Sequence, residues 1–163
     1  MESVVLLREV RRDDLPIFFA QQLDPEANTM AAFAARDSEA FMARWDRTLA
    51  DATAIKQTIV CNDRVAGNIG CFEQDGQREV GYWLGREYWG RGIATRALAA
   101  FLDQVPLRPL HAYVARHNIA SRRVLEKCGF TVVGEDKNFT EVAGETIEAT
   151  ILKLEATVGD AAL

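Results

Sequence analysis

Short apolar-rich stretches of strand length recur along the chain, separated by turn-forming residues. The turns include Asn62–Arg64 and Gln74–Gln77, which predict two successive hairpins, and Thr140–Gly144 near the end. The predicted strands run at 3–9, 54–61, 65–73, 78–84, 109–115, 130–138 and 145–154.

Helical periodicity is clearest at 37–50, where Phe41, Trp45 and Leu49 recur at four-residue spacing. Asp37 or Ser38 is expected to cap this helix. Further helices are predicted at 12–23, from Gly92 to about residue 104, and from Asn118 to a left-handed C-cap at Gly129.

The helix predicted at 12–23 carries its own boundary residues. Asp13 or Asp14 is expected to cap it, with Pro16 in the first turn, where a missing N–H costs little. The Asp24-Pro25 pair is expected to break it. The element order is then strand, two helices, three antiparallel strands, helix, strand, helix and two strands. That order predicts an α+β fold, with a mixed, mostly antiparallel sheet flanked by helices on both faces.

The 163 residues suit one domain spanning 1–163, with residues 156–163 expected to be frayed. The net charge of −5 argues against general nucleic-acid binding, which usually needs a basic surface. Cys61, Cys71 and Cys128 are widely spaced, which predicts reduced thiols and no metal site. With no signal peptide and no apolar stretch of about 20 residues, we expect a cytoplasmic protein that does not enter the membrane.

The segment 85–95 predicts an anion site. A strand leads into a turn with Gly90 and Gly92, which lets the backbone approach a ligand closely, and the turn opens a helix. The first-turn amides and the helix dipole then favour phosphate, and Arg91 adds charge. A Walker A loop is excluded because its Lys and hydroxyl are missing, and a Rossmann loop because Thr95 stands where the third glycine belongs.

The residues from Gly81 through Thr95 closely resemble the acetyl-CoA motif of GNAT-family N-acetyltransferases. The resemblance is to the subgroup that includes the ribosomal-protein alanine acetyltransferases, where Trp89 replaces the usual Gln or Arg. A second segment, 117–130, is similar to the family's Asn-x-x-Ser and Glu-Lys-x-Gly-Phe signatures. The resemblance covers residues from about 4 to 155 and implies the GNAT acyl-CoA N-acyltransferase fold.

The resemblance also implies acetyl-CoA as co-substrate and a direct transfer of its acetyl group to a primary amine. Loop amides would hold the pyrophosphate, the strand ending at Leu84 would diverge from the next strand to pair with pantetheine, and an N–H near Trp83 or Leu84 would polarise the thioester carbonyl. The implied coenzyme residues are Tyr82, Trp83, Leu84, Trp89, Gly90, Arg91, Gly92, Ile93, Ala94, Thr95, Asn118, Ser121 and Arg123.

Catalytic candidates follow from the same resemblance. Similar enzymes place a Ser at position 121, near the thioester sulfur, where it helps protonate the departing thiolate. Many relatives use a Tyr four residues later, and here that residue is Leu125. The general base is left open among Glu79, Tyr113 and Glu141.

The acceptor is also left open. It is a peptide N-terminus, or a small amine such as an aminoglycoside, an amino acid or a polyamine. A non-catalytic acyl-CoA-binding sensor is a further alternative, and a homodimer is a possible assembly. A strongly acidic acceptor groove would favour cationic small molecules, whereas an open, mixed groove would favour a peptide terminus.

Overall fold

The computed structural model describes residues 3–156. Its elements, in chain order, are β1 (Val5–Glu9), η1 (Arg12–Asp14), α1 (Leu15–Gln22), α2 (Pro25–Ala31), α3 (Ser38–Ala50), β2 (Ile55–Cys61), β3 (Arg64–Gln74), β4 (Gln77–Leu84), η2 (Arg86–Tyr88), α4 (Ile93–Gln104), β5 (Leu110–Ala115), α5 (Ile119–Lys127), β6 (Thr131–Val142) and β7 (Glu145–Leu154). The tail expected to fray falls, from residue 157 on, outside the described residues.

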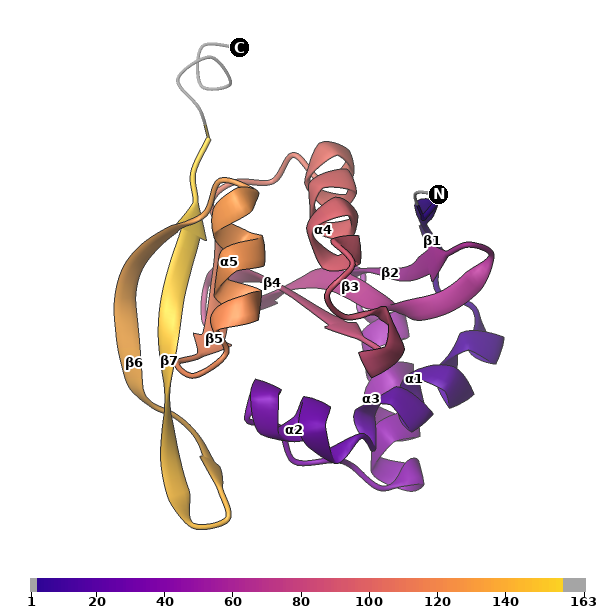
Figure 1. Cartoon of the computed structure of the whole chain (residues 1–163), viewed down its shortest axis with the longest axis horizontal. Coiled ribbons are helices and arrows are strands. Elements are labelled where there is room, and N and C mark those ends of the chain that lie inside the picture. Colours follow the sequence, from indigo (N-terminus) through magenta and orange to yellow (C-terminus); the bar gives the residue numbers. More distant parts are fainter. Residues whose placement is uncertain (1–2, 157–163) are drawn as a thin grey trace.

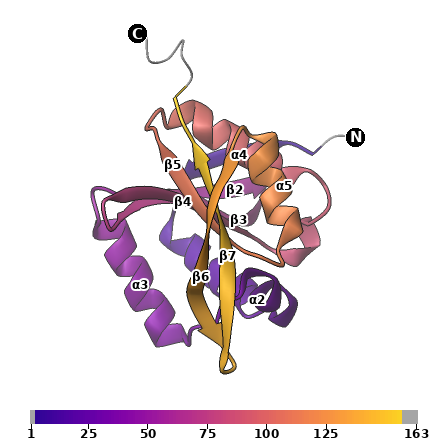
Figure 2. The same cartoon turned by 90° about the vertical axis from the view of Figure 1, so that its left-hand side faces the viewer.

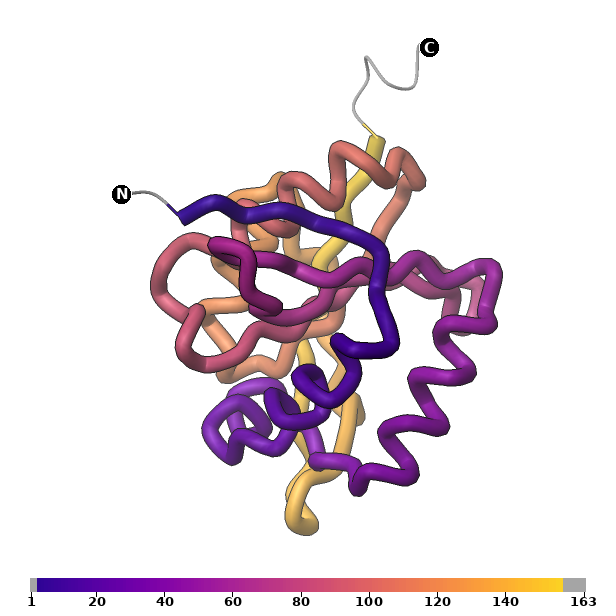
Figure 3. The backbone as a smooth tube through the Cα atoms, turned by 90° about the vertical axis from the view of Figure 1, so that its right-hand side faces the viewer, coloured from indigo at the N-terminus to yellow at the C-terminus, as the bar shows by residue number. Residues whose placement is uncertain are grey.

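The seven strands form one sheet in the order β1-β2-β3-β4-β5-β7-β6. Only β4 and β5 pair in parallel, and the other neighbours are antiparallel, which agrees with the mixed, mostly antiparallel sheet predicted from the sequence. Helices α4 and α5 cover one face, and α1, α2 and α3 lie on the other side (Figure 1). The chain turns from β1, at the sheet edge, into α1 (Figure 3). The α+β fold with helices on both faces is confirmed.

Each face of the sheet has its own core. On the α4 side, Phe101 and Leu98 pack against the central strands and are fully buried. On the other side, Phe18 of α1 packs on Trp45 of α3, with ring centroids 5.2 Å apart. Of the three apolar residues whose spacing predicted α3, Phe41 and Trp45 are buried and Leu49 is exposed near the C-terminal end of the helix.

The N-terminal helical region differs from the prediction. The helix expected at 12–23 begins with a 3-10 turn, and α1 starts only at Leu15. Of the two predicted capping residues, Asp14 occupies the N-cap position of α1, but its side chain makes no cap bond to that helix. Its carboxylate instead accepts hydrogen bonds from Arg8, Thr58 and the Arg11 N–H at the start of the 3-10 turn. Asp24-Pro25 does end the first helix, but it also starts α2, with Asp24 as N-cap and Pro25 at the first helical position. Because proline favours that position, the same pair both stops one helix and begins another.

The final hairpin is longer than predicted. Strand β6 continues through the expected loop to Val142, with a register shift between Asp136 and Thr140, and the turn is only Ala143-Gly144. A bulge accommodates the extra residues, so the apolar pattern breaks while the strand continues. The hairpin extends past the sheet on the side of α2 and α3 (Figure 2).

Candidate functional site

The sheet opens between β4 and β5. The two strands pair only at Glu79 and His111, although β4 continues to Leu84. The C-terminal half of β4 therefore has an edge that β5 does not cover. This is the divergence that the resemblance to the GNAT family implied, and it leaves backbone groups free to pair with an extended ligand.

The register of β4 shows which backbone groups face this opening. The Gly85 N–H donates to the Ala66 oxygen at 2.9 Å, in line with the regular β3–β4 register. Backbone groups alternate between the two edges of a strand, so those of Trp83 face β3 and those of Tyr82 and Leu84 face the opening. Of the two amides expected to polarise a thioester carbonyl, only that of Leu84 points into it.

Gly67 of β3 permits the local path of β4. A Cβ atom at this position would collide with the Trp83 carbonyl oxygen. The absence of a side chain therefore lets the two backbones approach closely at the point where β4 leaves β5.

The loop after β4 delivers the chain to the N-terminus of α4. Gly90 and Gly92 have left-handed backbone conformations, with φ of 70° and 74°, and a Cβ at either would meet nothing within 4 Å. Gly92 is the N-cap of α4, so the free first-turn amides face open space. The indole Nε1 of Trp89 donates to the Leu84 oxygen at 3.1 Å and ties the loop back to β4.

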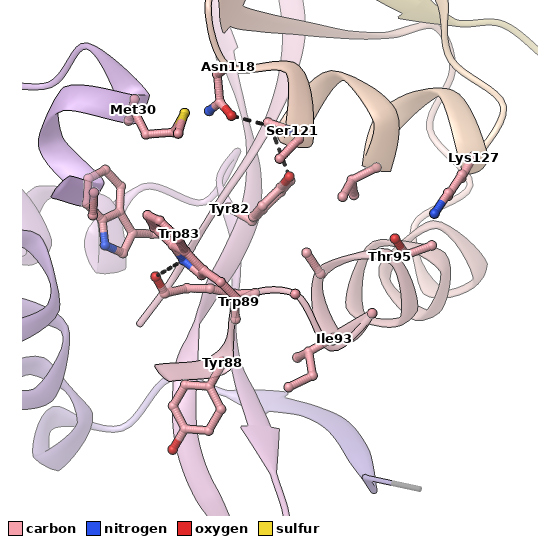
Figure 4. A pocket seen from close by; sticks show the side chains of 18 residues that line it. Met30, Tyr82, Trp83, Tyr88, Trp89, Ile93, Thr95, Asn118, Ser121 and Lys127 are labelled. Carbon is pink, nitrogen blue, oxygen red and sulfur yellow. Dashed lines mark hydrogen bonds between the residues drawn. The ribbon is translucent and has the colours of Figure 1, made fainter. Parts of the chain in front are cut away.

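A pocket of about 430 Å³ occupies this opening (Figure 4). Its walls are the end of β4, the glycine loop, the first turn of α4, one face of α5, and α2. The lining residues are Ala27, Met30, Ala31, Tyr82, Trp83, Leu84, Tyr88, Trp89, Gly90, Gly92, Ile93, Ala94, Thr95, Asn118, Ala120, Ser121, Val124 and Lys127.

A hydroxyl pair lies at the α5 wall. The Asn118 side chain accepts a hydrogen bond from the Ser121 N–H and so caps α5. The Ser121 Oγ lies 2.9 Å from the phenol oxygen of Tyr82 (Figure 4). Burial raises the pKa of Tyr82, so its phenol is protonated at neutral pH. The pocket thus holds two linked O–H groups. Leu125, at the position where many relatives have a tyrosine, is buried in the core.

The two arginines expected to bind the coenzyme, Arg91 and Arg123, do not line the pocket. The Arg91 guanidinium lies over the Tyr88 ring, 5.9 Å from its centroid, and donates to the Ser3 hydroxyl. Arg123 lies off the lining face of α5, whereas Lys127 lies on it. Positions 120, 124 and 127 share one face of α5, and this spacing brings Lys127 rather than Arg123 to the pocket.

The structure also places α2 in this wall, through Ala27, Met30 and Ala31. Sequence reasoning missed all three, since they lie in a helix that was not predicted. Helix α2 is held by an ion pair from Arg86 to Glu26 at 2.8 Å, and the His117 Nε2 lies 2.7 Å from the Thr29 oxygen.

The three candidate bases lie apart from this pocket. Glu79 is half-buried on β4, and burial followed by the charge of Asp75 raises its pKa. The Tyr113 hydroxyl donates to the Gln77 side chain at 3.2 Å. Glu141 is exposed on β6, opposite Thr146 in the final hairpin.

Glu79 shares a strand face with Gly81 and Trp83, because alternate residues of β4 point the same way. That face borders a second pocket of about 490 Å³, on the side of α1 and α3, which shares Tyr82 and Trp83 with the first. The two pockets are therefore neighbours across the end of β4.

Residues 3–156 contain no group of three or more His, Cys, Asp or Glu side chains that could hold a metal ion. Within the same range, no helix has the length and apolar character needed to cross a membrane.

Residues 5–131, well over half of the chain, match the family described as acetyltransferase (GNAT) domain. Spermidine N(1)-acetyltransferase of Escherichia coli is 28% identical over 141 residues, which cover 80% of this chain and 75% of that enzyme. The uncharacterized N-acetyltransferase p20 of Bacillus licheniformis is 28% identical over 99 residues, which span 56% of either chain.

Solved structures share the fold. Spermidine N-acetyltransferase from Vibrio cholerae, in complex with CoA and spermine, superimposes with a TM-score of 0.81 at 16% identity, covering 93% of this chain and 95% of that one. RimL, a ribosomal L7/L12 α-N-protein acetyltransferase in complex with coenzyme A, gives a TM-score of 0.80 at 18% identity and covers 93% of each chain.

Proposed function

The chain belongs to the acetyltransferase (GNAT) family and is an acetyl-CoA-dependent N-acetyltransferase. We propose that it passes the acetyl group of acetyl-CoA directly to a primary amine, the N-terminal α-amine of a peptide or protein. The observation that carries this proposal is the opening between β4 and β5, which lies beside the N-terminus of α4 and next to the second pocket.

The pocket residues fit the coenzyme. The first-turn amides of α4, exposed by Gly90 and Gly92, would hold the pyrophosphate, and Lys127 would add a positive charge. The free edge of β4 would pair with the amide groups of pantetheine, and the Leu84 N–H would polarise the thioester carbonyl. When bound, acetyl-CoA supplies the activated acyl group.

The hydroxyl pair supplies the proton that transfer requires. As the acceptor nitrogen bonds to the carbonyl carbon and the carbon–sulfur bond breaks, Ser121 would donate its proton to the sulfur, and Tyr82 would donate in turn to Ser121. Leu125 stands where many relatives have the tyrosine used at this step. In this chain, Tyr82 of β4 instead brings a phenol to Ser121.

Removing the amine proton needs only a modest base. A protein α-amine has a pKa near 8, against about 10.4 for a lysine side chain, so part of it is already neutral at pH 7. Glu79 is the preferred candidate, because it is half-buried, has a raised pKa, and lies on the strand face that borders the second pocket. A water molecule would bridge it to the amine.

Two alternatives predict different behaviour. An enzyme for small amines such as polyamines would acetylate spermidine in preference to peptides. A coenzyme-binding sensor would bind acetyl-CoA without turnover of any amine. Calorimetry with acetyl-CoA and acetylation assays on peptides and small amines distinguish these alternatives from peptide acetylation.

The test is calorimetric titration with acetyl-CoA, followed by mass spectrometry of a peptide and small-amine panel. Gly92→Glu should abolish binding, since a carboxylate there fills the pyrophosphate position and repels it. Gly76→Glu is the matched control, because Gly76 also has a positive φ of 79° and open space but lies in the distant β3–β4 turn. Binding by folded wild type and Gly76→Glu, lost in Gly92→Glu, supports the coenzyme site. Equal binding by all three would overturn it, and spermidine as the preferred acceptor would overturn the peptide proposal.

A further inference from the structure

The second pocket lies beside the acyl-transfer site and collects positive charge. Four cationic side chains line it: Arg36 from the segment before α3, Arg44 and Arg47 from α3, and Lys56 from β2. We propose that this pocket selects an acceptor whose amine is accompanied by an anionic group, a carboxylate or a phosphate. This inference rests on the proposed function and names its substrate class.

The positive charge of this pocket is only partly offset within the protein. Among residues 3–156, none of these four cations takes part in an ion pair within 4.0 Å. Two acids also line the pocket: Glu73 is paired with Arg78, whereas Asp51 has only neutral hydrogen-bond donors and keeps its negative charge, so four cations face one such carboxylate. Asp51 accepts hydrogen bonds from the N–H and hydroxyl of Thr53 at 2.9 and 2.7 Å, and Glu73 binds Arg78 at 2.9 Å.

Arg36 is held in place through its backbone. The buried Gln22 side chain, 4% exposed, donates to the Arg36 oxygen at 3.0 Å and accepts from the Arg36 N–H at 2.9 Å. Its guanidinium lies over Phe33, 5.0 Å from the ring centroid, and Phe33 packs on Trp83 at 5.2 Å. The backbone of Arg36 is therefore anchored, and its guanidinium stacks on Phe33, which in turn packs on a residue that lines both pockets.

Two of the four cations, Arg36 and Lys56, have lowered pKa values, in part because of the positive charges beside them. Burial and the charges of Arg44 and Arg47 lower the pKa of Arg36. Lys56 lies 5.4 Å from the Trp45 ring centroid, and burial followed by the charge of Arg44 lowers its pKa to about 8. A carboxylate placed among them would relieve this repulsion and form charge-assisted, bidentate hydrogen bonds with an arginine.

Charge and size together set the acceptor class. The volume of about 490 Å³ is within the range of small-ligand pockets and suits an amino acid or the first residues of a peptide. Gly81 leaves the β4 side open, since a Cβ there would meet nothing within 4 Å. A polyamine would bring several positive charges into this cationic pocket and be repelled. The pocket thus differs from what a spermidine acetyltransferase needs.

The test compares acceptors that differ only in charge. Initial rates of CoA release are measured with acetyl-CoA and peptides that begin Ala-Glu, Ala-Gln or Ala-Lys, with free glutamate, and with spermidine. The expected kcat/KM for Ala-Glu exceeds that for Ala-Gln by about tenfold or more, the gain from charge-assisted hydrogen bonds. Free glutamate distinguishes a small-molecule acceptor from a peptide.

Arg36→Gln should remove most of this preference, because the variant keeps both backbone bonds to Gln22 and loses only the guanidinium. Its KM for acetyl-CoA should match that of the wild type. Arg12→Gln is the control for loss of one positive charge, since Arg12 is exposed, pairs with Asp46 and does not line the pocket.

The outcomes separate this inference from the proposed function. Equal or better turnover of Ala-Gln, Ala-Lys or spermidine overturns the anionic acceptor and leaves the acetyltransferase intact. If no amine is acetylated, the transfer proposal fails, and calorimetry of Ala-Glu against Ala-Gln in the presence of CoA decides the pocket. Preferred binding of Ala-Glu then supports the anionic site, and equal or absent binding overturns it.

Discussion

The phenol oxygen of Tyr82 lies 2.9 Å from the hydroxyl oxygen of Ser121, and the two residues stand 39 positions apart in the chain. One belongs to β4 at the sheet opening and the other to the first turn of α5. Their contact joins two walls of the proposed coenzyme pocket through a pair of O–H groups, of which Ser121 alone was expected to take part in proton transfer.

Removing either hydroxyl should slow the chemical step. Ser121→Ala and Tyr82→Phe are each expected to lower kcat by about 10²-fold, the usual contribution of a positioned general acid. The double variant should be about as slow as either single variant, because the hydroxyls act as a unit. Acetyl-CoA affinity by calorimetry should change little. Single variants with wild-type kcat would remove the pair from the mechanism.

Glu79 should act as the general base. Glu79→Gln is expected to lower kcat/KM by about 10²-fold near pH 7. In the wild type, the acidic limb of the pH profile should fall above the ordinary glutamate range, since the pKa of Glu79 is raised. Glu141→Gln is the matched control and Tyr113→Phe tests the remaining candidate. A larger loss in either of these variants would transfer the role to it.

The close approach of the β3 and β4 backbones at Gly67 should be required for stability. Gly67→Ala drives a methyl group into the Trp83 carbonyl, so the free energy of unfolding should fall by about 1–3 kcal/mol. Gly81→Ala, where nothing lies within 4 Å, should change it by no more than about 0.5 kcal/mol. Urea denaturation measures both variants. Equal stability would show that β4 has room to move at Gly67.

The ion pair of Asp14 with Arg8 should make stability depend on pH below about 4. Burial by itself raises the pKa of Asp14, but hydrogen bonds from Arg8, Thr58 and the Arg11 N–H outweigh it and lower the pKa to about 2. Because this value is below the ordinary 3.8, the contribution is complete above pH 4 and is lost as pH falls toward 2.

Asp14→Asn should therefore cost roughly 3 kcal/mol of unfolding free energy at pH 7 and less at pH 3, because it leaves the Arg8 charge without its partner. Urea denaturation at both pH values measures the difference. A cost that stays constant between pH 7 and pH 3 would contradict the assignment.

Much of the fold could be predicted from the sequence, because it depends on neighbouring residues. The two hairpin turns, Asn62-Asp63 and Asp75-Gly76, have the positive φ values that these residue types accept, and they set the order of β2, β3 and β4. Helix α2 was not predicted, because Asp24-Pro25 is compatible both with the end of one helix and with the start of the next. The sequence pattern does not distinguish a pair that only ends a helix from one that also begins another.

Local chemistry likewise determined the coenzyme loop. Gly90 and Gly92 before an amphipathic helix predict exposed first-turn amides wherever that helix packs, so the anion site follows from residues within one segment. The nature of the acceptor does not follow from any one segment.

Only the tertiary structure decided how distant segments meet. The divergence of β4 from β5 depends on sheet pairing, the Tyr82–Ser121 contact on the packing of α5 against β4, and the cationic pocket on Arg36, α3 and β2 converging. Within its own segment, nothing in the pattern of neighbouring residues distinguishes Ser121 or any of the four cationic residues from a solvent-exposed polar residue. The sequence by itself therefore determined the strands, the turns and the glycine loop of this acetyltransferase. Long-range packing decided the hydroxyl pair that we propose as proton donors and the charge of the pocket that we propose for the acceptor, because those properties arise only between elements.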